Sequence, residues 1–100
     1  MGERATGLIG TWKSDPDDAT GAKGYGRVTL EFGSDGTLLY ISHGADKDEI
    51  IRLTYLIEPG FIVTNQPSHP KLERTRYSFT SDGRLILAFG GQQSRYVRSI

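Results

Sequence analysis

The residues best suited to bind a small molecule are five aromatic side chains, three of which carry a hydroxyl group. Phe32, Tyr40, Tyr55, Tyr77 and Phe79 stand within the segments that the sequence predicts to be strands. An aromatic ring supplies apolar contact area, and a tyrosine hydroxyl can orient the polar end of a ligand. The pattern favours these five residues as a site for a small apolar or amphipathic ligand. The competing interpretation is that they are core residues whose hydroxyls reach a cavity mouth.

Other chemistry has less support in the sequence. His43, Asp46 and Asp48 lie in one loop, and His69 lies in another that could approach it, so imidazole and carboxylate groups suited to zinc are present. Loops of this composition are more often solvated turns, so we expect no metal. The chain has no Cys and no Gly-x-Ser-x-Gly motif. We therefore predict no catalytic residue and no cofactor, and a binding protein is favoured over an enzyme.

Charge is unevenly distributed along the chain. Residues 1–50 hold five basic and nine acidic side chains, whereas residues 51–100 hold seven basic and three acidic ones. Such asymmetry can indicate an acidic partner or nucleic acid. A sequence pI of about 6.7 argues against nucleic acid, and solvated arginines on an outer strand face are the simpler explanation. The arginines concerned are Arg74, Arg76, Arg84, Arg95 and Arg98.

The elements that must position these side chains are short strands joined by tight turns. Dipeptides that favour hairpin turns occur at Asp35-Gly36, Pro59-Gly60, Asp82-Gly83 and Gly90-Gly91. Glycine supplies the positive φ angle that such turns need, and aspartate often precedes it. No stretch keeps apolar residues at helical spacing over three turns. The sequence therefore predicts an all-β fold.

The runs between the turns give about eight strands, several of which alternate apolar and polar residues. Val28, Leu30 and Phe32 share one face of a strand, and the polar residues between them, including Thr29, share the other. This period of two is typical of a strand with one buried and one solvated face. The expected strands are 8–13, 25–32, 37–42, 49–57, 61–65, 72–80, 84–89 and 94–98.

Consecutive strands joined by tight turns are expected to pair in sequence order. Eight strands in a row would leave two exposed edges unless the first strand pairs with the last. We therefore predict one domain over residues 1–100, an antiparallel up-and-down β-barrel of about eight strands. A barrel built from only 100 residues should be tight inside, with room for side chains or for one small ligand.

Three segments resemble a known family. They are the opening Gly10-Thr11-Trp12, the hairpin from Phe32 to Thr37, and the closing Tyr96-Val97-Arg98. Together they resemble the small lipocalin-like domains of the calycin superfamily, which includes lipocalins and fatty-acid-binding proteins. The resemblance implies a lipocalin-like barrel closed by Gly10, Trp12 and Arg98, with a basic residue packed across the indole. Arg95 is the alternative to Arg98 in this role.

The chain departs from that family in two respects. It is shorter than typical members, and residues 14–24 are too few for the helical lid of fatty-acid-binding proteins. No arginine and tyrosine cluster that would hold a fatty-acid carboxylate can be assigned. The resemblance therefore implies ligand binding inside the barrel without implying which ligand.

The leading expectation is a lipocalin-like binding protein for a small hydrophobic ligand. The alternative is an interaction module with a filled barrel, which would use its Arg-rich outer face or a sheet edge to bind a partner or to form a homodimer. The longest apolar run, residues 85–89, is far shorter than the roughly 20 residues that span a bilayer. No signal peptide is visible, so we expect a cytoplasmic protein or an exported one whose signal segment lies outside this chain.

Overall fold

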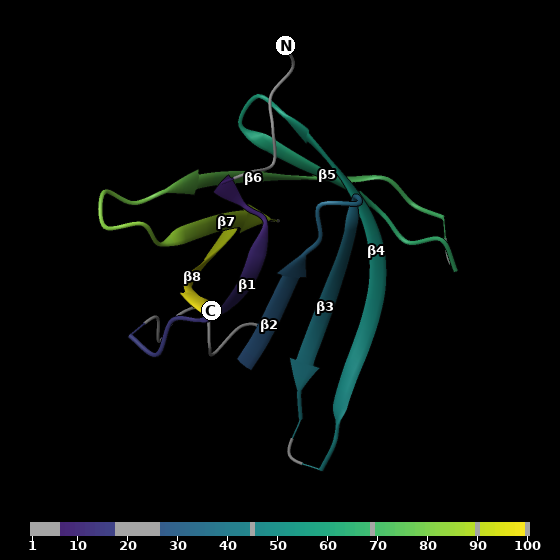
Figure 1. The fold of residues 1–100 in the computed structure, drawn as a ribbon, viewed down its shortest axis with the longest axis horizontal. Helices are drawn as coiled ribbons and strands as arrows, with labels where there is room; N and C mark the ends of the chain where they lie inside the picture. Colours follow the sequence, from purple (N-terminus) through teal and green to yellow (C-terminus); the bar gives the residue numbers. More distant parts are fainter. Residues whose placement is uncertain (1–6, 18–26, 45, 69, 90, 100) are drawn as a thin grey trace.

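Eight antiparallel strands follow one another in chain order and close into a barrel (Figure 1). The computed structural model describes residues 7–17, 27–44, 46–68, 70–89 and 91–99. The predicted all-β barrel is confirmed. In these described ranges, no helix is long and apolar enough to cross a membrane. The strands are β1 (Gly10–Ser14), β2 (Arg27–Phe32), β3 (Thr37–His43), β4 (Asp48–Glu58), β5 (Phe61–Asn65), β6 (Glu73–Phe79), β7 (Leu85–Phe89) and β8 (Gln92–Ser99).

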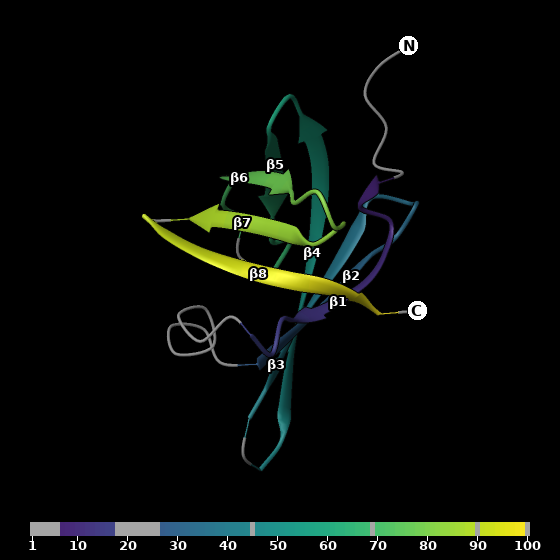
Figure 2. The same ribbon diagram turned by 90° about the vertical axis from the view of Figure 1, so that its left-hand side faces the viewer.

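The barrel is closed by pairing between its first and last strands. β1 lies between β2 and β8, with Trp12 opposite Leu30 on one side and opposite Arg98 on the other. Each of the described strands therefore has a hydrogen-bonded neighbour on both sides, and no strand is left as an edge strand of the sheet. Figure 2 shows β1 and β8 side by side, and the β3–β4 hairpin extending beyond the other strands.

Alternation along the strands decides which side chains point into the barrel. In β6, Thr75 and Tyr77 are partly buried, whereas Arg74 and Arg76 are exposed. β4 follows the same rule, with a buried Tyr55 between exposed neighbours. The core consists of Leu8, Trp12, Val28, Leu30, Phe32, Leu38, Tyr55, Ile62, Leu85 and Tyr96.

Thr29 departs from the predicted solvated face of β2. Its side chain is buried, and its hydroxyl forms a 2.7 Å hydrogen bond with Nε2 of His43. The other ring nitrogen of His43 lies 3.1 Å from Oδ1 of Asp48. The alternation of β2 predicts that Thr29 is exposed to solvent. His43 and Asp48 of the neighbouring strands β3 and β4 supply the polar contacts that accompany its burial.

The turn between β2 and β3 shows why an Asp-Gly dipeptide predicts a hairpin. Gly36 has a φ of +86°, in the left-handed region that glycine adopts without a steric cost. The backbone N–H of Thr37 donates a 3.0 Å hydrogen bond to Oδ1 of Asp35. The aspartate side chain thus stabilises the turn that the glycine permits.

Trp12 and Arg98 connect the N-terminal segment to the last strand. The indole of Trp12 is buried, and its Nε1–H donates a 2.9 Å hydrogen bond to the carbonyl of Leu8. The guanidinium carbon of Arg98 lies 4.3 Å from the centroid of a Trp12 ring. The same guanidinium donates to the carbonyls of Ile9 (2.9 Å) and Gly7 (2.7 Å). The structure therefore places Arg98, rather than Arg95, over the indole.

Gly10 provides the space that this arrangement needs. Its φ is +127°, and a Cβ atom at this position would lie 2.8 Å from Nη1 of Arg98. Any larger residue would be strained in its backbone and would push the guanidinium away from the indole. Arg98 thus lies over Trp12 and beside Gly10, which explains why a glycine is needed two positions before the tryptophan.

Asp15 forms a second connection between the two ends of the chain. Its side chain is only 1% exposed, and its Oδ2 accepts hydrogen bonds from Nη1 of Arg84 (2.8 Å) and Nε of Arg95 (2.7 Å). Oδ1 accepts a 2.9 Å bond from the backbone N–H of Asp17. The Asp17 N–H first, and then the two guanidinium groups, hold the pKa of Asp15 below its usual value despite the opposing effect of burial.

We predict that Trp12→Ala lowers the free energy of unfolding by about 3 to 5 kcal/mol, as large aromatic deletions from cores do. Arg98→Ala removes a cation–π contact and two charged hydrogen bonds, and should cost about 1 to 3 kcal/mol. Urea unfolding followed by circular dichroism measures both. Arg52→Ala on the exposed face of β4 is the control, with a change within about 0.5 kcal/mol. A loss below about 1 kcal/mol for Trp12→Ala would contradict its role in the core.

A second prediction concerns acid stability. Because the folded-state pKa of Asp15 is lowered, its stabilising contribution is complete above the ordinary aspartate pKa of about 3.9 and is lost as the pH falls through the lowered value. Asp15→Asn should destabilise the protein by about 1.5 to 3 kcal/mol at pH 7, and by less below pH 4. Urea unfolding at both pH values tests this, with Asp17→Asn as control. A difference that stays constant with pH would contradict the assignment.

Candidate functional site

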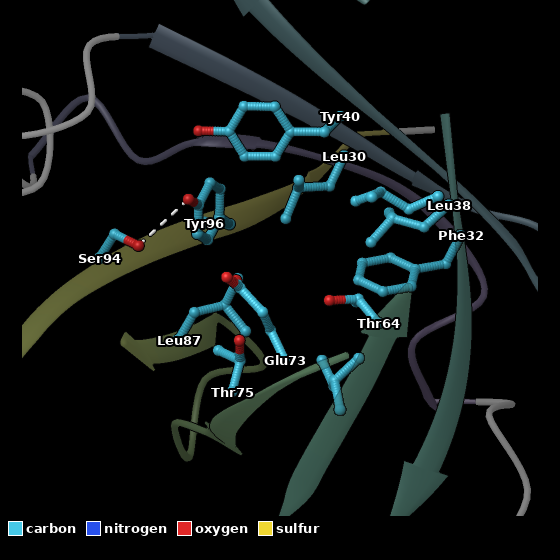
Figure 3. A pocket seen from close by; sticks show the side chains of 12 residues that line it. Leu30, Phe32, Leu38, Tyr40, Thr64, Glu73, Thr75, Leu87, Ser94 and Tyr96 are labelled. Carbon is cyan, nitrogen blue, oxygen red and sulfur yellow. Dashed lines mark hydrogen bonds between the residues drawn. The ribbon is translucent and has the colours of Figure 1, made fainter. Parts of the chain in front are cut away.

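A cavity of about 250 Å³ lies inside the barrel, between side chains that β2 to β8 direct inward (Figure 3). An apolar cavity of about 150 Å³ is enough to hold benzene, so this one suits a ligand of about ten non-hydrogen atoms. The interior is therefore not completely filled by side chains. The lining residues are Leu30, Phe32, Leu38, Tyr40, Leu53, Ile62, Thr64, Glu73, Thr75, Leu87, Ser94 and Tyr96.

The apolar and polar lining residues come mainly from different strands. Leu30, Phe32, Leu38 and Leu53 form an apolar wall on β2, β3 and β4. Hydroxyl and carboxylate groups come mainly from β5, β6 and β8. The cavity is thus amphipathic, and it is suited to a ligand with an apolar body and one polar end.

The polar wall begins where β5 and β6 pair. Thr64 on β5 is the register partner of Glu73 on β6. Thr75 follows two residues after Glu73, on the same face of the strand. Two hydroxyl groups therefore accompany the Glu73 carboxylate on this side of the cavity.

β8 adds two buried hydroxyl groups to the polar wall. The Ser94 hydroxyl donates a 3.1 Å hydrogen bond to the hydroxyl of Tyr96 (Figure 3). The two residues are separated by one position, so alternation places them on the same face of the strand. Their hydrogen bond fixes the orientation of both side chains at the cavity wall.

Glu73 is the single charged residue among the lining residues that the structure describes. Figure 3 shows its side chain directed into the cavity. The side chain is 36% exposed, and its Oε2 lies 3.3 Å from Nζ of Lys71, which is itself 76% exposed. Glu73 therefore lies where the cavity meets solvent.

Of the five aromatic residues that the sequence favours, Phe32 and Tyr40 line the cavity. Tyr55 is buried but is not among the lining residues. Its hydroxyl donates a 2.7 Å hydrogen bond to the carbonyl of Gly33, and its ring packs edge-on against Phe32 with centroids 5.1 Å apart. Burial raises the pKa of Tyr55, and the charge of Asp35 adds to the effect. Tyr55 thus supports the cavity from behind Phe32.

Tyr77 and Phe79 also lie outside the cavity lining. Their rings pack edge to face, with centroids 5.9 Å apart, and the Phe79 ring lies 6.0 Å from Trp12. Phe79 is 43% exposed, although the alternation of β6 predicts an inward position for it. The structure therefore gathers the last two aromatic residues of β6 beside the tryptophan.

The ligand-site residues predicted from the sequence are all aromatic, so the prediction does not include the polar lining residues Thr64, Glu73, Thr75 and Ser94. The sequence does contain a signal for two of them. Glu73, Thr75 and Tyr77 are successively two positions apart, so Glu73 and Thr75 lie on the same face of a strand as the inward-facing Tyr77. Thr64 and Ser94 offered no comparable signal. Their relevance depends on which strands surround the same space.

The loop considered for metal binding has a different arrangement. His43 contacts Thr29 and Asp48, as described above, and the second histidine considered, His69, lies outside the described residues. Among the residues that the structure describes, no group of three or more His, Cys, Asp or Glu side chains could hold a metal ion.

The five arginines between residues 74 and 98 make separate intramolecular contacts. Arg74 forms a 2.8 Å ion pair with Glu58, and its guanidinium carbon lies 4.7 Å from the ring centroid of Phe61. Arg76 lies over the same ring at 5.3 Å. With Arg84 and Arg95 on Asp15, and Arg98 on Trp12, the five arginines serve three different parts of the barrel.

Comparisons with protein-family models, curated proteins and solved structures gave no significant match. The geometry of the cavity is therefore the basis for inferring function.

Tyr55→Phe should lower the free energy of unfolding by about 0.5 to 1.5 kcal/mol at pH 7, because the Gly33 carbonyl loses the Tyr55 hydroxyl and keeps only the longer bond from the Gly36 N–H. Since burial raises the pKa of Tyr55, the wild-type protein should also lose stability as the pH rises above the ordinary tyrosine value of about 10. The variant should lack this part of the alkaline loss. Urea unfolding between pH 7 and 11 measures both effects, and identical alkaline profiles would contradict the assignment.

Proposed function

We propose that this barrel is a binding protein for a small amphipathic ligand of about ten non-hydrogen atoms, held in the central cavity. The observation that carries the proposal is a 250 Å³ space with an apolar wall on β2 to β4 and polar groups mainly on β5, β6 and β8. Ligand sites in proteins typically combine a mostly apolar lining with a few polar groups that fix orientation. No catalytic role is assigned to the lining residues.

The resemblance to lipocalin-like domains supports the same proposal. The chain closes its barrel by pairing β1 with β8, and Arg98 packs on Trp12 in the manner that the resemblance implies. In that family the ligand is held inside the barrel. Membership of the family is part of the proposal, and it rests on the eight-stranded architecture together with the Gly10, Trp12 and Arg98 arrangement.

The alternative, an interaction module with a filled barrel, has less support. Each described strand has a paired neighbour on both sides, and the unpaired edge that remains on β4 is limited to residues 48–53, which pair with β3 alone. Each of the arginines that the sequence singled out contacts a residue of the same chain. Exposed apolar side chains that could serve self-association are Ile50 and Leu56 on β4 and Leu72 just before β6, which are 62%, 71% and 72% exposed.

Filling the cavity should abolish binding while the barrel is kept. Thr75→Phe adds a ring to the cavity, whereas Ser78→Phe adds the same ring to the exposed face of β6. Overpacking should cost Thr75→Phe about 1 to 3 kcal/mol of stability, so its fold is checked first by circular dichroism. NMR titration of the wild-type protein with 2-phenylethanol should give saturable shifts at lining residues, kept in Ser78→Phe and lost in Thr75→Phe.

Two results would count against the proposed function. One is a wild-type protein without saturable shifts for any small amphipathic compound of this size. The other is a folded Thr75→Phe variant that binds as well as the Ser78→Phe control.

A further inference from the structure

We propose that the polar end of the ligand is an amine, bound in its protonated form by Glu73. This inference rests on the proposed function and adds the chemical class of the ligand. Glu73 brings the single charge among the described lining residues, and its side chain is directed into the cavity (Figure 3). An ionised carboxylate accepts hydrogen bonds and donates none, so it selects a donor and favours a positively charged one.

The groups beside Glu73 also suit an ammonium ion. Thr64 lies opposite Glu73 in the β5–β6 register, and Thr75 shares the inward face of β6 with it. A threonine hydroxyl has two acceptor lone pairs, and a primary ammonium has three N–H donors. The carboxylate and the two neighbouring hydroxyls thus offer as many acceptor groups as the ammonium has donors.

Lys71 does not remove this preference. Its Nζ contacts Oε2 of Glu73 at 3.3 Å, but the lysine is 76% exposed and is not a lining residue. Ion pairs between exposed side chains contribute little, because water solvates and screens both groups. The lysine approaches from solvent, which leaves the carboxylate available to a cation that approaches from the cavity.

A carboxylate ligand is disfavoured by the same geometry. The described lining contains no Arg, Lys or His to pair with an anion. A fatty acid that placed its carboxylate among the polar groups would bring it close to Glu73, where like charges repel. The cavity therefore favours amines over neutral alcohols, and alcohols over acids.

Three ligands of nearly equal size separate these outcomes: 2-phenylethylamine, 2-phenylethanol and phenylacetate. Titration calorimetry or NMR at pH 7 and low salt should show the amine binding roughly tenfold to a hundredfold more tightly than the alcohol, as expected for a charge-assisted hydrogen bond. The acid should bind most weakly. Glu73→Gln should remove most of the difference in affinity between the amine and the alcohol.

Lys71→Gln is the matched control, because it removes the partner of Glu73 and keeps the carboxylate. It should leave amine binding unchanged or slightly stronger. If the alcohol or the acid binds as tightly as the amine, or if Glu73→Gln leaves amine binding unchanged, the amine inference is wrong while the proposed function stands. If none of the three ligands binds the wild-type protein, the proposed function and the inference fail together.

Discussion

The pairing of β1 with β8 is the interaction on which the rest of the structure depends. Before it forms, the sheet has two free edges and no enclosed interior. Two side-chain clusters support the pair: Arg98 lies over Trp12 within it, and Asp15, just beyond β1, binds Arg84 and Arg95. The contacts of Asp15 join residues 69 and 80 positions apart. Because such contacts close long loops, they carry a chain-entropy cost that the other contacts of the barrel must offset.

The uneven distribution of large side chains explains how so short a chain keeps a cavity. The rings of Trp12, Tyr77 and Phe79 gather in one part of the barrel, with neighbouring centroids about 6 Å apart. The cavity of about 250 Å³ has three aromatic residues in its lining, Phe32, Tyr40 and Tyr96, and its other lining residues are Leu, Ile, Thr, Ser and Glu. A tight interior follows from the length of the chain, and the hollow part remains where the smaller Thr and Ser side chains of β5, β6 and β8 face the apolar wall.

The hydrogen-bond partners of Asp15 and Glu73 explain why one carboxylate has a structural role and the other is suited to bind a ligand. Asp15 is almost fully buried, and three donors satisfy its oxygens. Glu73 lies at the cavity, and the ion pair described for it is with an exposed lysine. A carboxylate whose hydrogen bonds are already made holds the fold together. One that faces a cavity with acceptor capacity to spare is suited to bind a ligand.

The sequence by itself determined the strands and their order, because alternation and Asp-Gly turns are local signals; the strand over residues 61–65 has the predicted bounds. It also indicated a basic residue over Trp12, and left Arg95 and Arg98 as alternatives. Only the tertiary structure decided that Tyr40 lines the cavity while Tyr55 bonds to Gly33, and that Glu73 belongs to the site. Alternation specifies the face of a strand, whereas the height of a residue in the barrel depends on the stagger between paired strands.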